Sequence, residues 1–297
     1  MTAIGAVVVV VATIWGLFLG IRSTDASEKG STPDQKAEAR DQSEKDEEDA
    51  KEAGPPIQSA AGYPNFYSSR YAFPERTLEL GEGEGALYGT AAYTNWFTKN
   101  RAVEVGAGAV RVTLSPLHKG TVVIQNMRLT NLKCQPTKYA GTAVVPPAIG
   151  DGGDEVVPVN IAFDLTEPVP RPRINAGRVI SESADSDEVW QIKGNAFSKE
   201  FYLDGGDQAD ARSFDLFFFT GKKDCNFGVE VNVTSGSKNG WFPITLGDDS
   251  TYEVAGQAER YESVVLPSNT GDEAAVQNVL HGPGNPFTPI RLQKSQF

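Results

Sequence analysis

Histidine is scarce in this chain, and this limits the chemistry that its side chains can perform. The 297 residues include only His118, in a predicted turn, and His281, in the sequence HGPGNPF. Neither belongs to an H-E-x-x-H zinc motif, and no G-x-S-x-G sequence offers a serine nucleophile. Two histidines also disfavour a histidine-based metal centre. We interpret both as surface loop residues and predict no catalytic residue, while enzyme activity stays an open question.

Three acidic loops carry the oxygen ligands that calcium prefers. Their carboxylates are Asp151, Asp154 and Glu155 in GDGGDE, Asp204, Asp207 and Asp210 in DGGDQAD, and Asp248 and Asp249 in GDDS. None of the loops has the spacing of an EF-hand, and Asp and Gly are also the residues that tight turns require. Calcium is therefore an open prediction beside the simpler one of ordinary turns, and no other cofactor is predicted.

Cys134 and Cys225 are the only cysteines of the chain. The absence of a C-x-x-C sequence excludes a zinc ribbon or a thioredoxin-type redox motif. On an exported chain two lone cysteines predict one disulfide, whereas a reducing compartment would leave two buried thiols. Both cysteines are in phase with apolar residues, so we expect both to point into the core. Their bond would close a loop of about 92 residues and stabilise the fold by about 4–5 kcal/mol.

Strands with alternating apolar and polar residues must position these groups. Clear alternation covers 110–114, 157–165 and 225–234, and Pro158 indicates that its strand begins there or lies at a sheet edge. Apolar residues shift faces within 122–134, which predicts bulges near Asn126 and Asn131. Residues 213–220, SFDLFFFT, are apolar on both faces and predict a central strand. Weaker strands are predicted at 87–94, 189–192, 201–203 and 264–266.

Many short strands joined by Gly, Asp, Pro and Asn predict a mainly β domain over residues 57–297. We expect a β-sandwich, immunoglobulin-like or related. Past residue 56 the best candidate for a helix is the short segment 272–280. Aromatic residues gather where this domain begins, and they are Tyr63, Phe66, Tyr67, Tyr71 and Phe73. They would line a groove for sugar or peptide or, as we favour, form a first strand or lid packed on the core.

Residues 1–21 are predicted to form a transmembrane helix. Ile4 to Ile21 is an 18-residue run without charge or proline, and eleven of its residues are Ile, Leu, Val or Phe. These residues favour membrane insertion by about 3–7 kcal/mol. A cleaved signal peptide is the alternative, with a small-x-small site at Thr24–Ala26, but the apolar run is longer than such signals need. Small residues on one helix face predict a homodimer contact through Ala12, Gly16 and Gly20.

Residues 22–56 are predicted to be a disordered charged linker. They contain six basic and eleven acidic side chains and no Ile, Leu, Val, Phe, Tyr or Trp. Such a segment cannot bury enough apolar surface to offset the entropy of the chain. Residues 35–53 favour helix by composition, but they have no apolar stripe with which to dock.

Charge and cysteine content together indicate the cellular location. The formal net charge of −12 argues against a nucleic-acid partner, because phosphate binding needs clustered Lys and Arg. Arg22 alone beside the apolar run would favour a cytoplasmic domain, whereas the predicted disulfide favours an oxidising space. We give the disulfide more weight and predict a single-pass protein of the cell membrane with an extracellular domain.

The closing strands contain CNFGVEVNV, from Cys225, then a Gly-rich turn and Pro286-Phe287. With the order of apolar span, charged linker and strand-rich domain, they resemble uncharacterised actinobacterial single-pass membrane proteins with an exported β-rich domain. The likeness covers about residues 105–290. It implies an exported domain and no catalytic residues.

These features predict a membrane-anchored extracytoplasmic binding or interaction module whose ligand is unknown. Its partners would be membrane lipid, through residues 1–21, and an unknown protein or an envelope polysaccharide. Two alternatives stay open: a cell-envelope hydrolase that uses paired carboxylates, and the sensory ectodomain of a membrane complex. A deep cleft lined by two carboxylates would favour the hydrolase, and a flat or aromatic-lined face would favour the binding module.

Overall fold

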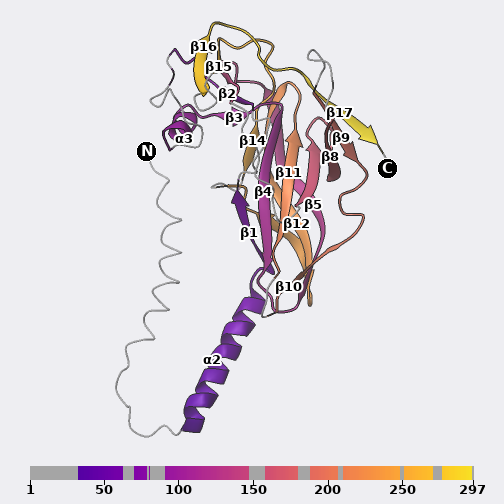
Figure 1. Cartoon of the computed structure of the whole chain (residues 1–297). Coiled ribbons are helices and arrows are strands. Elements are labelled where there is room, and N and C mark those ends of the chain that lie inside the picture. Colours follow the sequence, from indigo (N-terminus) through magenta and orange to yellow (C-terminus); the bar gives the residue numbers. More distant parts are fainter. Residues whose placement is uncertain are drawn as a thin grey trace, which may run out of the picture. The chain divides into compact units, whose positions relative to one another are not determined.

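The computed structural model describes residues 33–62, 70–78, 80, 91–146, 158–179, 188–206, 210–247, 251–269 and 276–295. Strands dominate this part of the chain, which confirms the prediction of a mainly β domain (Figure 1). The helices are α2 (Pro33–Ala53) and α3 (Ala91–Lys99). The strands are β1 (Ile57–Gly62), β2 (Tyr71–Phe73), β3 (Val103–Glu104), β4 (Ala107–Pro116), β5 (Thr121–Pro136), β6 (Thr142–Val144), β7 (Val159–Asp164), β8 (Arg173–Val179), β9 (Glu188–Lys193), β10 (Phe201–Asp204), β11 (Arg212–Phe219), β12 (Lys223–Ser235), β13 (Lys238–Ile244), β14 (Tyr252–Val254), β15 (Ser263–Asn269), β16 (Val276–His281) and β17 (Ile290–Ser295).

The described strands form three sheets. A seven-stranded sheet has the order β1-β4-β11-β7-β8-β9-β17, and a second sheet has the order β10-β5-β12-β13, with β14 paired to β12. The third sheet has the order β16-β15-β6-β2-β3. Pairing is mixed, because β11 with β7, β15 with β6 and β17 with β9 run parallel whereas the other pairs are antiparallel. The first two sheets share the largest apolar cluster, to which β11 contributes Phe214 and Phe218 and β12 contributes Phe227 and Val231.

Strand β11 is central, as its composition predicts. It pairs with β4 on one side and with β7 on the other. Phe214, Leu216 and Phe218 point into the large cluster, whereas Phe217 and Phe219 pack on the opposite face against Trp190. A strand covered on both faces is apolar throughout, so the loss of alternation in SFDLFFFT was the informative signal. Pro158 precedes the first residue of β7, as predicted for a strand that begins there.

The long pair β5 and β12 contains the two predicted bulges. The register shifts between Asn226 and Gly228 and again between Asn232 and Val233, each time with an extra residue on β5. The first shift places Asn131 in the left-handed region, with φ of 52°, which asparagine tolerates better than most residues. Both shifts lie where the apolar residues of β5 change faces, which confirms the prediction of bulges near Asn126 and Asn131.

Two predictions of individual secondary-structure elements, a strand at 87–94 and a helix at 272–280, are wrong. Of the predicted strand 87–94, residues 91–94 begin helix α3, and residues 87–90 lie outside the described residues. Of the predicted helix 272–280, residues 276–280 belong to strand β16, which pairs with β15. In both cases tertiary packing overrides a weak local preference: Trp96 and Phe97 of α3 pack edge-to-face on the rings of β2. Helix α3 ends in a Schellman motif, with Ala102 donating to the carbonyl of Phe97 at 3.0 Å.

Part of the predicted disordered linker is helical. Pro33–Ala53 forms α2, which corrects the prediction for these residues. Proline suits the first turn of a helix, and Gly54 follows the last residue, so the ends carry standard start and stop signals. Between them the chain consists largely of good helix formers such as Ala, Glu, Lys and Gln. The lack of an apolar face, which motivated the prediction of disorder, does not remove this intrinsic preference.

The predicted transmembrane helix at residues 1–21 and its small residues Ala12, Gly16 and Gly20 lie outside the described residues. Among the residues that are described, no helix combines the length and the apolar character needed to cross a bilayer. The chain divides into two units between Ala53 and Gly54, so α2 and the sheets belong to different units.

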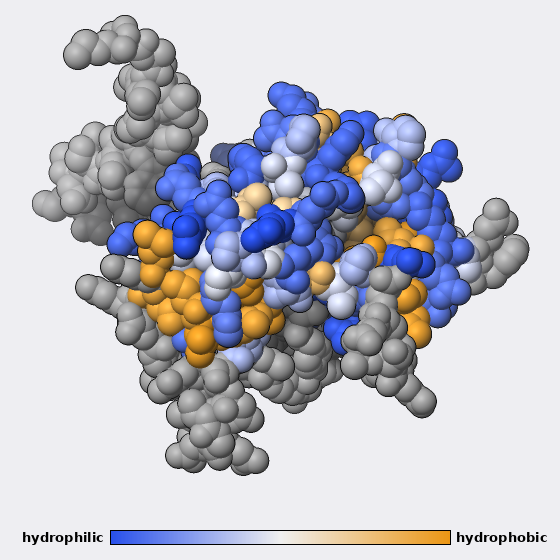
Figure 2. Space-filling model, turned by 90° about the horizontal axis from the view of Figure 1, so that it is seen from above, coloured by the Kyte–Doolittle hydropathy of each residue, from blue (hydrophilic) through white to orange (hydrophobic). Residues whose placement is uncertain are grey.

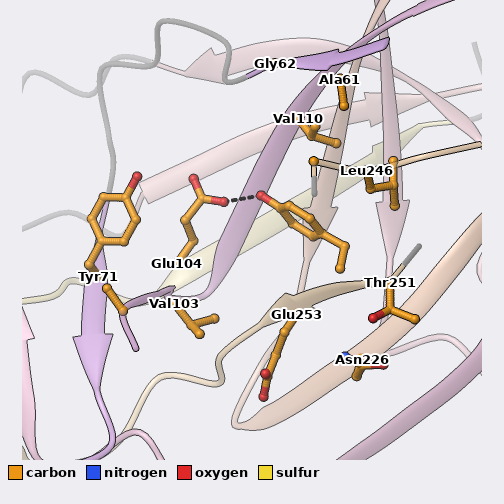
Figure 3. Close-up of a pocket in the computed structure, with 13 residues that line it drawn as sticks. Ala61, Gly62, Tyr71, Val103, Glu104, Val110, Asn226, Leu246, Thr251 and Glu253 are labelled. Carbon is orange, nitrogen blue, oxygen red and sulfur yellow. Dashed lines mark hydrogen bonds between the residues drawn. The ribbon is translucent and has the colours of Figure 1, made fainter. Parts of the chain in front are cut away.

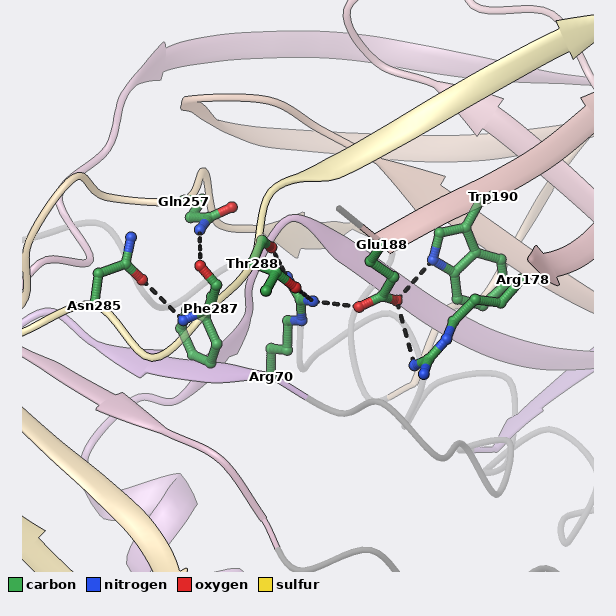
Figure 4. Close-up of polar contacts among 8 residues, drawn as sticks. All are labelled: Arg70, Arg178, Glu188, Trp190, Gln257, Asn285, Phe287 and Thr288. Carbon is green, nitrogen blue, oxygen red and sulfur yellow. Dashed lines mark hydrogen bonds and ion pairs between the residues drawn. The ribbon is translucent and has the colours of Figure 1, made fainter. Parts of the chain in front are cut away.

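One buried ion pair ties the third sheet to the seven-stranded sheet (Figure 4). Arg70, just before β2, forms an ion pair with Glu188, the first residue of β9, and both side chains are almost fully buried. Arg70 also donates to the carbonyl of Thr288 at 2.6 Å and to its hydroxyl at 3.1 Å. Glu188 accepts a further hydrogen bond from Trp190 Nε1 at 2.8 Å. Segments more than 100 residues apart in the sequence therefore meet at one guanidinium group.

Hydrophilic residues cover most of the described surface in the view from above, and apolar residues gather in a few patches (Figure 2). Around α3 and β16 the partly buried apolar side chains are those of Leu80, Phe97, Ala102 and Leu280. They pack on a small buried cluster of Phe73, Trp96, Val144 and Val265, so their inner faces complete the third sheet's core.

Candidate functional site

The two histidines lie in different environments. His118 is 2% exposed, which corrects the prediction of a surface loop residue. Its Nδ1 lies 2.9 Å from the hydroxyl of Ser235, and its Nε2 lies 3.2 Å from the carbonyl of Gly54. These contacts satisfy both ring nitrogens and connect the start of the domain to the end of β12, which is a structural role. His281, the last residue of β16, is exposed as predicted.

The acidic loops are described only in part. Asp151, Asp154, Glu155, Asp207, Asp248 and Asp249 lie outside the described residues. Of the DGGDQAD loop, Asp204 accepts a hydrogen bond from the amide of Gly206 at 3.1 Å, and its carbonyl accepts one from the amide of Asp210 at 2.9 Å. These are turn contacts. Within the described residues no three His, Cys, Asp or Glu side chains are grouped as metal ligands would be.

Cys134 and Cys225 form a disulfide, with the sulfurs 2.08 Å apart and the Cα atoms 4.2 Å apart. The pairing is the predicted one, but its setting differs from the prediction. The two residues lie directly opposite each other on the neighbouring strands β5 and β12. Cys225 is buried, whereas Cys134 is exposed, so only one of the two cysteines lies in the core. Directly opposite residues of an antiparallel pair share one face of the sheet, so Cys134 has the predicted face, but it is exposed because the core does not cover this end of β5, where Lys133–Pro136 are all exposed.

The aromatic residues that open the domain separate into two roles. Tyr63, Phe66 and Tyr67 lie outside the described residues. Phe73 is buried and packs edge-to-face on Trp96, 4.9 Å between ring centroids, as the favoured packing interpretation predicts. Tyr71 is partly exposed, packs edge-to-face on Phe97 and lines a pocket, so a groove for sugar or peptide stays a prediction for this residue.

The pocket is a cavity of about 500 Å³, within the range of small-molecule sites (Figure 3). The ends of β1, β2 and β3 and the strand β14 surround it, together with single residues of β4 and β12. Its lining residues are Ala61, Gly62, Tyr71, Ala102, Val103, Glu104, Val110, Asn226, Leu246, Gly247, Thr251, Tyr252 and Glu253. Apolar side chains thus alternate with a few polar groups, which is the usual composition of a ligand site.

Glu104 is held firmly in this pocket. Its Oε2 accepts a hydrogen bond from the hydroxyl of Tyr252 and one from the amide of Ala109 at 3.1 Å. The Tyr252 hydroxyl also lies 3.1 Å from the carbonyl of Ala109, so its single proton has two acceptors within reach. Gly108 allows this close approach, because a Cβ there would lie 2.6 Å from Val254 and 3.0 Å from the ring of Tyr252.

Burial raises the pKa of Glu104 from its ordinary value of 4.5 to about 7, although the hydrogen bonds from Tyr252 and Ala109 oppose the rise. When Glu104 is protonated it can donate to the Tyr252 oxygen, and Tyr252 can then donate to Ala109. When it is ionised, Tyr252 donates to it instead. Both protonation states thus have satisfied hydrogen bonds, and the group changes charge near neutral pH.

The second carboxylate of the pocket, Glu253, has a different environment. It follows Tyr252 on β14, and its side chain points away from Glu104 (Figure 3). Its carboxylate forms an ion pair with Lys138 at 3.1 Å, and this neutralises its charge. Among the lining residues that the structure describes, the one uncompensated charge is therefore that of Glu104.

Glu104 and Tyr252 were not predicted from the sequence. The available signal was a single acid between two valines in RAVEVGAGAV, because a charge in an apolar strand needs a partner. Its partner Tyr252 lies 148 residues further along the chain, so only the folded structure brings the two together.

Glu104 should make the domain less stable as pH rises. Its pKa is higher in the folded state than in the unfolded state, so between pH 4.5 and 7 the folded state binds more protons. The contribution of this group therefore declines as pH rises through that window, by as much as about 3 kcal/mol. Urea unfolding of the wild type and Glu104→Gln at pH 5 and pH 8 tests this. We expect the stability of the variant relative to the wild type to rise with pH, and a difference that does not change with pH would contradict the shift.

Comparison of the chain with protein-family models, with curated proteins and with solved structures yields no match. The geometry described above is therefore the basis on which its function is proposed.

Proposed function

We propose that this chain is a membrane-anchored, extracytoplasmic binding module that takes a small polar ligand in the pocket around Glu104. The single observation that supports this is the cavity of about 500 Å³, in which Glu104 is held by Tyr252 and Ala109 with one carboxylate oxygen left for a ligand. Rigid strands surround the pocket on several sides, and preorganised groups on such elements lose little entropy when they bind. The seven-stranded sheet and the sheet of β10, β5, β12, β13 and β14, which share one core, would act as a β-sandwich scaffold.

The location that we propose is the outer side of the cell membrane. The apolar run at residues 4–21 would anchor the chain in lipid, with Ala12, Gly16 and Gly20 as a contact face for a second copy. The disulfide between Cys134 and Cys225 supports an oxidising compartment, because an exposed disulfide is reduced readily in the cytoplasm.

A ligand screen on the full chain in detergent micelles tests the proposal. Small polar molecules, including amines, sugars and carboxylic acids, are scored by the shift in melting temperature of the wild type. Gly62→Trp fills the pocket, because a Cβ at Gly62 meets no atom within 4 Å and the residue lines the cavity. Gly282→Trp is the matched control, since Gly282 has the same open surroundings and does not line the pocket.

We expect at least one compound class to stabilise the wild type and the control but not Gly62→Trp. The proposal is overturned if the compounds stabilise Gly62→Trp as much as the wild type. It is also overturned if no compound class stabilises the wild type.

A cell-envelope hydrolase is a second candidate, because two carboxylates line one pocket and Glu104 has the raised pKa of a general acid. The direction of Glu253, away from Glu104 and toward Lys138, makes the binding function the better supported one. Release of reducing sugar ends from envelope polysaccharide by the wild type, abolished in Glu104→Gln, would establish the hydrolase.

A further inference from the structure

We propose that the ligand of the Glu104 pocket is a small organic cation with a primary ammonium group and a single positive charge. This inference rests on the function proposed above and names the chemical class that the pocket selects.

The charge of the pocket is the first argument. Two of the described lining residues, Glu104 and Glu253, carry a formal charge, and both are acidic. None of the described lining residues is Lys, Arg or His. Glu253 is compensated by Lys138, so one negative charge remains at Glu104. In a partly buried site that charge attracts a single cation strongly and repels an anion, because water screens it less than at the surface.

The direction of the free oxygen is the second argument. Oε2 of Glu104 already accepts from Tyr252 and Ala109. The other oxygen of this pocket-lining residue, Oε1, points away from the dashed hydrogen bond (Figure 3), and no donor among the described residues contacts it. An N–H group of a ligand can therefore reach a carboxylate oxygen without displacing an existing bond, and such charge-assisted hydrogen bonds are the strong ones.

The aromatic and apolar lining is the third argument. Tyr71 lies directly opposite Glu104 in the pairing of β2 with β3, and Tyr252 donates to the Glu104 carboxylate, so both rings can favour a cation that approaches it. Beyond the acid, the cavity is lined by small apolar side chains such as Ala61, Val110 and Leu246. A compact apolar body attached to the ammonium group fits this lining better than a hydrated metal ion, which needs several oxygen ligands.

Cyclohexylammonium is a suitable probe, because cyclohexanol and cyclohexanecarboxylate have nearly the same shape and differ in charge. We titrate each into the full chain in detergent micelles at pH 8, where Glu104 is ionised, and measure heat. We expect cyclohexylammonium to bind at least tenfold more tightly than cyclohexanol, and cyclohexanecarboxylate not to bind. Putrescine, a dication, should bind no more tightly than butylammonium.

Glu104→Gln preserves the size of the side chain and should weaken cyclohexylammonium binding by about 10- to 100-fold, as loss of a hydrogen bond to a charged group does. Glu259→Gln is the matched control and should bind like the wild type, because Glu259 is exposed and pairs only with Lys222 among the described residues. Melting curves by circular dichroism check that both variants fold.

The outcomes separate this inference from the proposed function. If cyclohexanol binds as tightly as cyclohexylammonium and Gly62→Trp blocks both, the pocket is a binding site and the cation specificity is wrong. If Glu104→Gln folds and binds cyclohexylammonium like the wild type, the inference is also overturned. The proposed function fails only when the wider screen gives no compound class that is sensitive to Gly62→Trp.

Discussion

Replacing Cys134 with Ser and Cys225 with Ala in the same chain is expected to lower the free energy of unfolding by about 4–5 kcal/mol. The bond joins residues 91 positions apart, and a cross-link that closes so long a loop removes much conformational entropy from the unfolded chain. Alanine suits position 225, which is buried, and serine suits position 134, which is exposed. Urea unfolding of the full chain in detergent micelles measures the difference.

The control for this prediction lies on the same two strands. Lys133 and Asn226 are opposite residues next to the disulfide, and both are exposed. Lys133→Ser with Asn226→Ser alters the same ladder without removing a covalent bond, so we expect a much smaller loss. Reduction of the wild type should lower the free energy of unfolding as much as the cysteine substitutions do. A reductant can reach the bond because Cys134 is exposed. Equal stability of the two double variants would contradict the prediction.

Replacing Glu188 with Ala is expected to cost about 3–5 kcal/mol of stability, the second large effect. The substitution leaves the Arg70 guanidinium buried without its carboxylate, and an uncompensated buried charge is strongly destabilising (Figure 4). It also removes the acceptor of the hydrogen bond from Trp190. Because Arg70 precedes β2 while Glu188 begins β9, the loss should loosen the third sheet from the seven-stranded sheet.

Two further variants make this prediction specific to the pair. Arg70→Met combined with Glu188→Leu removes both charges and should be more stable than Glu188→Ala alone, since neither charge is then left unpaired. Glu259→Ala breaks the exposed pair with Lys222, and its unfolding should match that of the wild type. If Glu188→Ala unfolds at the same urea concentration as Glu259→Ala, the buried pair does not hold the sheets together.

Much of the strand content could be predicted from local pattern alone. Strands β4, β5, β7, β11 and β12 all lie where alternation or a continuous apolar run indicates them, and the bulges of β5 lie where its apolar residues change faces. The pattern is informative because side chains on a strand alternate between two environments, one buried and one exposed. Where that contrast is weak, the outcome varies: the predicted strands 189–192, 201–203 and 264–266 lie in β9, β10 and β15, whereas the predictions for 87–94 and 272–280 are wrong.

Helix α2 lies in a segment for which we predicted disorder. Its residues have good helix propensity but no apolar stripe, and the prediction of disorder rested on the absence of that stripe. Propensity and packing are separate contributions, so a segment that buries nothing can still adopt helical backbone geometry.

The sequence by itself determined the mainly β character of the domain and, because only two cysteines exist, which residues form its disulfide. Only the tertiary structure decided which strands are neighbours, that Cys225 is buried while Cys134 is exposed, and that Glu104 meets Tyr252 in one pocket. The physical reason is the sequence separation of the contacts. Alternation is a pattern among adjacent residues, and it indicates only which of them are buried. Contacts across 91 or 148 positions depend on how the sheets assemble, and no local pattern contains that information.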